Sequence, residues 1–184
     1  RHTRYISVTG VQTCALPIFL LNQCNLIIYS MRYPTVELIL SAGFQEIHQV
    51  APGIYRGSQP DLDALKELKA MGIKTVLSVN DEYVFEEAKA CDELQLDFFS
   101  IPLICRNPVD PQLVEMAISL LSDCKTHPIY IHCEHGHDRT GLILGLYRVW
   151  RDNWTVDDAW NEMLSLNFHP DEVHLSEFFW NQFI

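Results

Sequence analysis

The first regular pattern along the chain is a run of apolar residues at helical spacing. Apolar side chains recur every three residues from Leu62 to Met71, and Asp61 precedes them in the position of a helix N-cap. Gly72 suits the C-terminal end of this helix, and a short apolar strand at 73–79 follows directly.

Helical and strand patterns then alternate along the rest of the chain. Helices are expected at 82–94, 111–122, 140–152 and 156–166, and strands at 96–103 and 128–132. This alternation predicts an α/β fold with a central, mostly parallel sheet flanked by helices, and an aromatic-rich tail with Phe178 and Trp180 would help to cover the sheet. Ligands of such sheets bind at the carboxyl ends of the strands, so functional residues are expected in the segments that follow them.

The domain organisation is expected to be simple. No internal repeat, low-complexity tract or Gly/Ser linker follows Met31, which indicates a single domain over residues 31–184. Residues 1–30 begin without methionine and resemble translated sequencing-adaptor contamination, so we expect a non-native leader outside the fold, with Met31 as the natural start. The alternative is a signal peptide, since basic residues precede an apolar stretch at 14–29 that polar residues interrupt.

The charge of the chain argues against some partners. The formal net charge is −11, and residues 1–30 contain two arginines but no Lys, Asp or Glu, so residues 31–184 carry −13. This charge opposes nonspecific association with nucleic acid or anionic membranes, but it permits a local positive pocket for one phosphate. Because no apolar run reaches the ~18 residues of a spanning helix, we expect neither a nucleic-acid nor a membrane partner.

The cysteines indicate a reducing compartment. The chain has six cysteines, which form no C-x-x-C pair, show no zinc-ligand spacing and are too sparse for a disulfide scaffold. We therefore expect a cytoplasmic location.

One segment after the apolar strand at 128–132 carries most of the candidate chemistry. In the sequence HCEHGHDRTG, which starts at His132, five residues separate Cys133 from Arg139. Five residues allow the backbone to curl into a ring of inward N–H groups, and Gly136 permits the tight bend. The residues expected to surround one bound phosphate are Glu134, His135, Gly136, His137, Asp138 and Arg139.

The side chains of this segment have distinct expected roles. A helix that starts near Arg139 would direct its positive N-terminal end at the phosphate and favour the thiolate of Cys133, the expected nucleophile. The planar guanidinium of Arg139 can hold two phosphate oxygens. Thr140 can donate its hydroxyl to the thiolate, and His132 can fix the loop through backbone hydrogen bonds.

The same segment resembles the His-Cys-x5-Arg-Thr-Gly signature of protein tyrosine and dual-specificity phosphatases. The segments GIYRGSQP at 53–60, IPL at 101–103 and LYRV at 146–149 resemble small bacterial and atypical dual-specificity members, so the resemblance spans roughly residues 50–183. It implies a dual-specificity phosphatase-like fold and a two-step, metal-free mechanism through phosphocysteine. It also implies a general acid from a loop that precedes the signature.

The general acid is the point at which the chain departs from this pattern. The family's usual aspartate, shortly after a strand that ends in Ile-Pro, corresponds to Cys105. Asp110 in the same loop is one candidate acid, and its alternative role is the N-cap of a helix that starts at Pro111. Asp138 is the second candidate, because myotubularin-like lipid phosphatases have an aspartate immediately before the signature arginine. Glu134, another carboxylate, or a leaving group that needs little protonation stay open.

Other reactive residues near the signature also have two interpretations. The histidines could form a metal site, but a phosphate loop sends most of its side chains outward, so we expect no metal and no other cofactor. Protonation of His135 and His137 would raise the affinity for anionic substrates below about pH 6.5. Cys105 is either a buried apolar residue or a thiol that forms a reversible disulfide with Cys133. Arg56 either reaches a substrate phosphate or forms a surface or fold-specific ion pair.

The predicted function is hydrolysis of a phosphate monoester through phosphocysteine. The expected partner is a protein phosphorylated on tyrosine, serine or threonine, or a small phosphomonoester, because a signature loop with two acids and no lysine disfavours highly phosphorylated inositols. The alternatives are a catalytically weak phosphate-recognition module and a phosphatase of a phosphoinositide or small metabolite. The x5 spacing with Arg-Thr-Gly disfavours sulfur transfer and arsenate reduction, and the sequence predicts no oligomeric state.

Overall fold

The computed structural model of the chain describes residues 37–39, 47–82 and 84–184. The expected leader at 1–30 and the expected start of the domain at Met31 lie outside the described residues. The described strands form one sheet in the order β1-β2-β3-β6-β4-β5. They are β1 (Glu37–Ile39), β2 (Ile47–Ala51), β3 (Ile54–Gly57), β4 (Thr75–Ser78), β5 (Asp97–Ser100) and β6 (Ile129–His132).

The sheet is mostly parallel, as predicted. The pairs β3–β6, β6–β4 and β4–β5 are parallel, whereas β1–β2 and β2–β3 are antiparallel. The β2–β3 hairpin was not predicted, because its strands are short and β2 places polar His48 and Gln49 in mid-strand. Gly53, with φ +81°, lies in the turn that joins them.

The helices follow the predicted pattern except at the C-terminus. They are α1 (Leu62–Ala70), α2 (Val84–Glu93), α3 (Pro111–Ser122), α4 (Asp138–Trp150), α5 (Val156–Ser165) and α6 (Val173–Asn181). Asp61 caps α1 as predicted, because its carboxylate accepts a hydrogen bond of 2.8 Å from the Ala64 N–H. The tail with Phe178 and Trp180, which the sequence predicted only as a cover, is helix α6.

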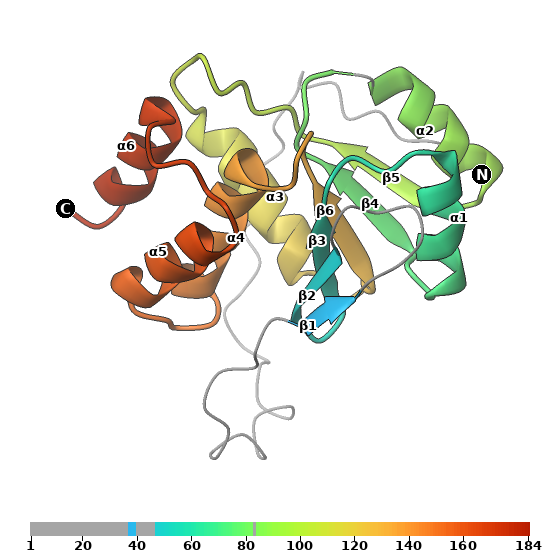
Figure 1. The fold of residues 1–184 in the computed structure, drawn as a ribbon, viewed down its shortest axis with the longest axis horizontal. Helices are drawn as coiled ribbons and strands as arrows, with labels where there is room; N and C mark the ends of the chain where they lie inside the picture. Colours follow the sequence, from blue (N-terminus) through green and yellow to red (C-terminus); the bar gives the residue numbers. More distant parts are fainter. Residues whose placement is uncertain (1–36, 40–46, 83) are drawn as a thin grey trace, which may run out of the picture.

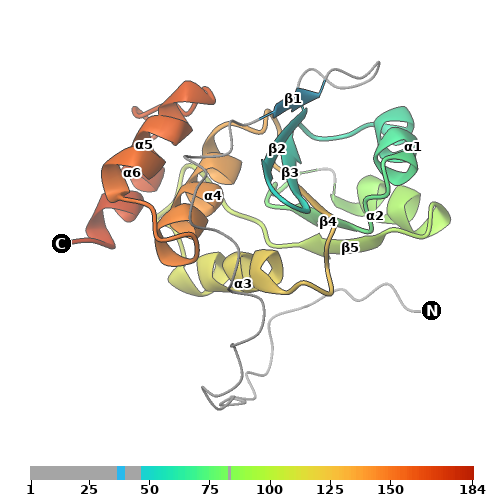
Figure 2. The same cartoon turned by 90° about the horizontal axis from the view of Figure 1, so that it is seen from below.

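Helices cover both faces of the sheet (Figures 1 and 2). Val76 and Tyr130 belong to the apolar core under α1 and α2, whereas the alternate positions Leu77, Ile129 and Ile131 belong to the core under α3 and α4. Helices α5 and α6 lie outside α4, so α4 is buried along most of its length. The predicted α/β architecture is therefore confirmed, with α4 as its central helix.

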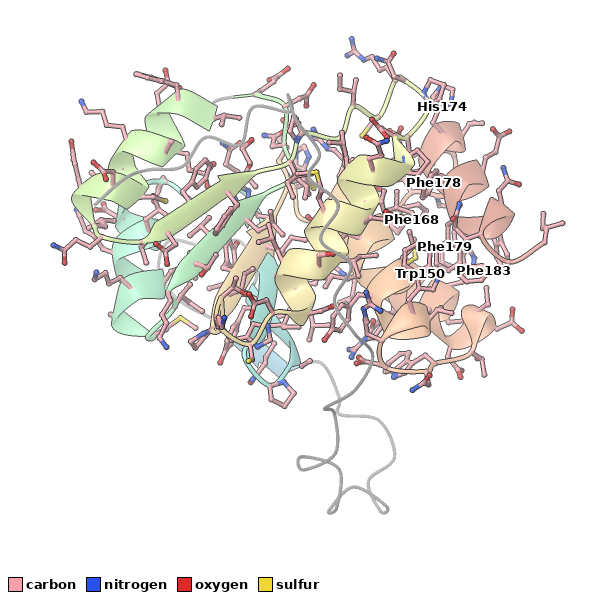
Figure 3. All side chains as sticks on the ribbon, turned by 180° about the vertical axis from the view of Figure 1, so that it is seen from behind. Trp150, Phe168, His174, Phe178, Phe179 and Phe183 are labelled. Carbon is pink, nitrogen blue, oxygen red and sulfur yellow. The ribbon has the colours of Figure 1, made fainter. Side chains whose placement is uncertain are left out.

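Aromatic side chains hold α5 and α6 together. Figure 3 shows Phe168, Phe178, Phe179 and Phe183 gathered around α6, away from the sheet. The ring of Trp160 lies 5.4 Å from the rings of Phe168 and Phe179 and 5.1 Å from that of Trp180, measured between centroids. Trp160 and Trp180 therefore fill a seam between α5 and α6.

The parallel strands bring four connecting segments to one edge of the sheet. The segments 58–60, 79–82, 101–105 and 133–137 follow the carboxyl ends of β3, β4, β5 and β6.

None of the helices described above combines the length and the apolar composition that a membrane-spanning helix needs.

Candidate active site

The backbone between β6 and α4 forms a loop whose N–H groups and carbonyls differ in their hydrogen bonding. Among the described residues, the N–H groups of 134–137 donate to no acceptor, whereas three carbonyls of the loop accept hydrogen bonds from outside. The Glu134 carbonyl accepts a bond of 3.0 Å from the Gln59 N–H. Since C=O and N–H point in opposite directions across a planar trans peptide, outward carbonyls leave the following N–H groups directed inward. This is the arrangement that a phosphate group requires.

Gly136 gives the loop its tight bend. Its φ is +76°, and a Cβ at this position would collide with the carbonyl of Gly57 in β3. The bend was predicted from the glycine alone. Its close contact with β3 adds a second reason why no side chain fits at this position.

Cys133 and Arg139 lie at opposite ends of the loop. Cys133 is buried directly after β6, and α4 begins at Asp138, so Arg139 lies in the first turn of this helix as predicted. The Arg139 guanidinium donates to Asn80 Oδ1 at 2.7 Å and to Asp81 Oδ1 at 2.6 Å. Burial alone would lower the pKa of Arg139, but the negative charge of groups around it, the Cys133 thiolate first, raises this pKa. The guanidinium therefore stays charged.

Asn80 and Asp81 were missed by the sequence analysis. They follow β4, whose end lies beside that of β6, and the only available signal was this position at a strand end. Asn80 Nδ2 donates to Gln59 Oε1 at 2.9 Å, so the segment after β3 also belongs to the site. The Nε atom of Arg139 is buried and has no acceptor in the described part of the chain, which leaves one donor for a ligand.

His132 is fixed as predicted and has a second partner that was not predicted. Its Nδ1 lies 3.2 Å from the Cys133 carbonyl, and its Nε2 lies 2.6 Å from Glu87 Oε1 of α2. Both side chains are almost fully buried. The signal for Glu87 was its place in the apolar stripe of α2 with Val84, Ala88 and Cys91, where a carboxylate needs a partner.

Thr140 lies under the loop with a free hydroxyl. The side chain is fully buried, and its Oγ1 has no hydrogen-bond partner among the described residues. The hydroxyl is therefore available to the Cys133 thiolate, and its predicted role stays a prediction.

The two predicted acids occupy different environments. Asp110 is exposed and caps α3, because its carboxylate accepts a bond of 2.9 Å from the Gln112 N–H. Asp138 Oδ1 accepts a bond of 2.8 Å from the His169 N–H and lies 3.0 Å from the His169 ring. The capping role of Asp110 is confirmed, whereas a catalytic role of either aspartate stays a prediction.

Cys105 lies near the site, in the segment after β5. Burial raises its pKa to about 11, and Arg139 opposes this rise. The residue is half-buried and carries a free thiol. At neutral pH this thiol is protonated, and a disulfide with Cys133 stays a prediction.

Comparisons with known proteins agree with this geometry. A model described as "Tyrosine phosphatase family" matches residues 44–183. The chain belongs to this family. It is 25% identical over 127 residues to the dual specificity protein phosphatase TpbA of Pseudomonas aeruginosa, covering 68% of this chain and 56% of TpbA. It is 26% identical over 114 residues to the inositol diphosphatase DSP5 of Arabidopsis thaliana, covering 59% of this chain and 55% of DSP5. The chain thus spans about half the length of these relatives.

Solved structures of the tyrosine phosphatase family share the fold. The crystal structure of P. aeruginosa TpbA has a TM-score of 0.63 at 22% identity, covering 73% of this chain and 83% of that one. The core catalytic domain of the PP-IP phosphatase SIW14 from S. cerevisiae has a TM-score of 0.63 at 22% identity, covering 78% of this chain and 86% of that one. The predicted dual-specificity phosphatase-like fold is confirmed.

Three histidines form a row at the rim of this candidate site. The ring centroids of His135 and His137 lie 6.2 Å apart, and those of His137 and His169 lie 6.1 Å apart. Burial lowers the pKa of His137, although Asp138 opposes this shift. No group of three or more His, Cys, Asp or Glu side chains within the described ranges is arranged to hold a metal ion.

The sequence suggested that Arg56 contacts a substrate phosphate or forms a surface or fold-specific ion pair, and the structure buries its side chain. Its side chain is buried beneath the phosphate loop and donates to loop carbonyls, so a surface ion pair is excluded. The segment 53–60, which resembles small dual-specificity phosphatases, therefore supports the loop between β6 and α4.

Proposed function

We propose that this chain hydrolyses phosphate monoesters through a phosphocysteine intermediate. The observation that carries the proposal is the ring of unbonded N–H groups at 134–137, with Cys133 at its base and Arg139 at its end. A phosphate bound there would place its phosphorus next to the Cys133 sulfur and its oxygens on N–H donors.

The first step transfers the phosphoryl group to sulfur. The Cys133 thiolate attacks phosphorus, the bond from phosphorus to the ester oxygen breaks, and an acid protonates the leaving oxygen. In the second step water attacks phosphorus, the P–S bond breaks and Cys133 leaves as thiolate. The Thr140 hydroxyl can donate to this thiolate and ease its departure.

Arg139 can take a phosphate without releasing Asn80 or Asp81. These two residues hold its Nη1, and only Glu134, 3.7 Å from its Nη2, would give way. Its Nε and Nη2 edge can then take two phosphate oxygens while Nη1 keeps its contacts to the segment after β4. The ion pair with Asp81 thus keeps the Arg139 guanidinium at the rim, in position to bind a phosphate.

Asp110 and Asp138 remain the proposed acids. Because an acid matters most when the leaving group is basic, removal of the true acid should reduce turnover of phenyl phosphate by about 10²–10⁴-fold and that of p-nitrophenyl phosphate much less. The variants to compare are Asp110→Asn and Asp138→Asn, with Asp81→Asn as a third carboxylate of the site. If none of the three shows this leaving-group dependence, the acid is another group.

For the substrate we propose proteins phosphorylated on tyrosine, serine or threonine. The rim carries the carboxylates of Asp81, Glu134 and Asp138 close to Arg139, and a rim of this kind repels further phosphates on a substrate. The similarity to TpbA, a dual specificity protein phosphatase, supports the same choice.

An inositol diphosphate is the second candidate substrate. The similarity to inositol diphosphatase DSP5 and the fold of the SIW14 core favour it, and the row of three rim histidines offers ring N–H donors to a second phosphate. A phosphotyrosine peptide and an inositol diphosphate, compared at pH 5.5 and 7.5, separate the two candidates by their kcat/KM.

The deciding test is hydrolysis of p-nitrophenyl phosphate in excess chelator by the parent and by Cys133→Ser. We expect chelator-resistant activity in the parent, a burst of phosphate on Cys133 under acid quench, and loss of both in Cys133→Ser. A folded parent that binds phosphate without turnover would instead support the recognition module.

A further inference from the structure

Arg56 is a buried cation without a carboxylate in hydrogen-bond contact among the described residues. It lies near the end of β3, its side chain is 2% exposed, and its Nη2 donates to the Gly136 carbonyl at 2.5 Å and to the His137 carbonyl at 3.3 Å. Burial lowers the pKa of Arg56 to about 10, while the Cys133 thiolate provides the strongest opposing attraction. A buried guanidinium is costly to desolvate, so its position directly behind the nucleophile calls for a reason.

The two carbonyls that Arg56 holds belong to the half of the ring next to Arg139. Each carbonyl shares a planar trans peptide with the N–H of the next residue, so the clamp on Gly136 and His137 directs the N–H groups of His137 and Asp138 to the opposite side. That side is the centre of the ring. The Gln59 N–H does the same for the other half of the ring through the Glu134 carbonyl.

The charges around Arg56 come from several elements. Glu162 of α5 and Asp138 of α4 attract it and Arg148 of α4 repels it, in addition to the Cys133 thiolate. The electrostatic neighbours of Cys133 itself are Arg56, Arg139, Cys105 and Tyr130. Arg56 and Arg139 therefore place two positive charges on the thiolate, one from behind the loop and one from its open side.

We propose that Arg56 is a positioning residue that holds the phosphate loop in its binding conformation and stabilises the Cys133 thiolate from behind, without contacting the substrate. This inference rests on the proposed function, since it assigns the support of the same loop. It predicts two separable contributions, because the planar fork orients peptides and the positive charge acts on sulfur.

The test uses alkylation of Cys133 by iodoacetamide, a neutral reagent that reports the thiolate without any turnover. Mass spectrometry identifies the alkylated cysteine, the pH profile of the rate gives a midpoint, and protection by inorganic phosphate gives the affinity of the loop. The variants are Arg56→Lys and Arg56→Met. Arg148→Lys is the matched control, since Arg148 is equally buried in α4 but bonds to Glu162, Asp152 and the Val50 carbonyl.

Each variant has a distinct expected result. Arg56→Lys keeps the charge and loses the fork, so we expect an alkylation midpoint near that of the parent and about tenfold weaker binding of phosphate. Arg56→Met loses both, so its midpoint should also rise by about one pH unit. The control Arg148→Lys should lower the melting temperature and leave both readouts unchanged.

A folded Arg56→Lys protein that binds phosphate as tightly as the parent overturns the proposal, even if Arg56→Met does not fold. The proposal is also overturned if Arg148→Lys changes the alkylation midpoint and the phosphate affinity as much as the Arg56 variants do. A general loss of stability then explains the effect. Failure of the proposed function looks different, since a parent without turnover still shows phosphate-protected alkylation.

Discussion

At the scale of single residues, the backbone of Cys133, the proposed nucleophile, depends on side chains that lie far from it in the sequence. Glu87 contacts the ring of His132, and His132 in turn contacts the Cys133 carbonyl. Both side chains are almost completely buried, so neither can exchange its partner for water. The orientation of the Cys133 peptide therefore rests on a carboxylate of α2.

Substitution of Glu87 tests this dependence. Glu87→Ala leaves the buried Nε2 of His132 without the oxygen that contacts it, so we expect a loss of about 1–3 kcal/mol in the free energy of unfolding. Glu87→Gln keeps an acceptor and should lose less than half as much. Urea unfolding measures both, and equal stability of the parent and Glu87→Ala would contradict the role of the pair.

The lowered pKa of His137 predicts how the free energy of unfolding responds to acid. Burial lowers its pKa in the folded protein, so on acidification the unfolded chain takes up the proton first. The contribution of His137 to stability is full above its unfolded pKa of about 6.5 and is lost as the pH falls toward the folded pKa. We expect the unfolding free energy of His137→Asn to fall less steeply than that of the parent between pH 7.5 and 5.5. Parallel pH profiles would contradict this assignment.

The sequence predicted the residues of the site that lie within one loop. Cys133, Gly136 and Arg139 were predicted because their spacing alone implies a ring of N–H groups. Asp81 and His169 were not, because only the folded chain brings the segment after β4 and the α5–α6 connection to this loop. Local spacing in the sequence specifies the loop between β6 and α4, whereas tertiary contacts specify the residues at its rim.

At the scale of elements, apolar spacing predicted most of the fold. Helices α1, α2, α3 and α5 were found from apolar residues at helical spacing, and β4, β5, β6 and α4 from apolar runs between them, whereas the central strand β3 was missed. Strands at 73–79 and 96–103 were predicted too long, since the apolar residues that follow β4 and β5 are buried in connecting segments. Helix α6 was missed because Phe178, Phe179 and Trp180 follow one another in it, and aromatic residues are typical of strands.

Substitutions of Asp110 can separate its capping of helix α3 from its proposed role as general acid. Asp110→Ala removes the cap of α3, so we expect a loss of about 1 kcal/mol in unfolding free energy. Asp110→Asn keeps an accepting oxygen at the cap and should retain most of this stability. Thermal unfolding gives the capping effect, and phenyl phosphate turnover gives the catalytic effect. A normal melting temperature for Asp110→Ala would contradict the capping role.

At the scale of the whole molecule, the net charge of −11 acts on any charged substrate that approaches. Screening shortens the range of this field from about 30 Å at 0.01 M salt to about 3 Å at 1 M. We expect kcat/KM to rise by about threefold over this range for a phosphopeptide with acidic flanks and to fall for one with basic flanks. A neutral-flanked peptide is the control, and the same salt response for both charged peptides would contradict long-range repulsion.

The clamp of Arg56 on Gly136 joins positions 80 residues apart, so it also sets the order in which activity can appear during synthesis. A nascent chain that has released β3 from the ribosome must wait for β6 and the first turn of α4 before its loop can close. Contacts of such long sequence separation form late in folding, after local helices. Partly made or partly folded chains are therefore expected to lack the proposed phosphatase activity, and the first appearance of this activity would report that β3 and β6 have paired.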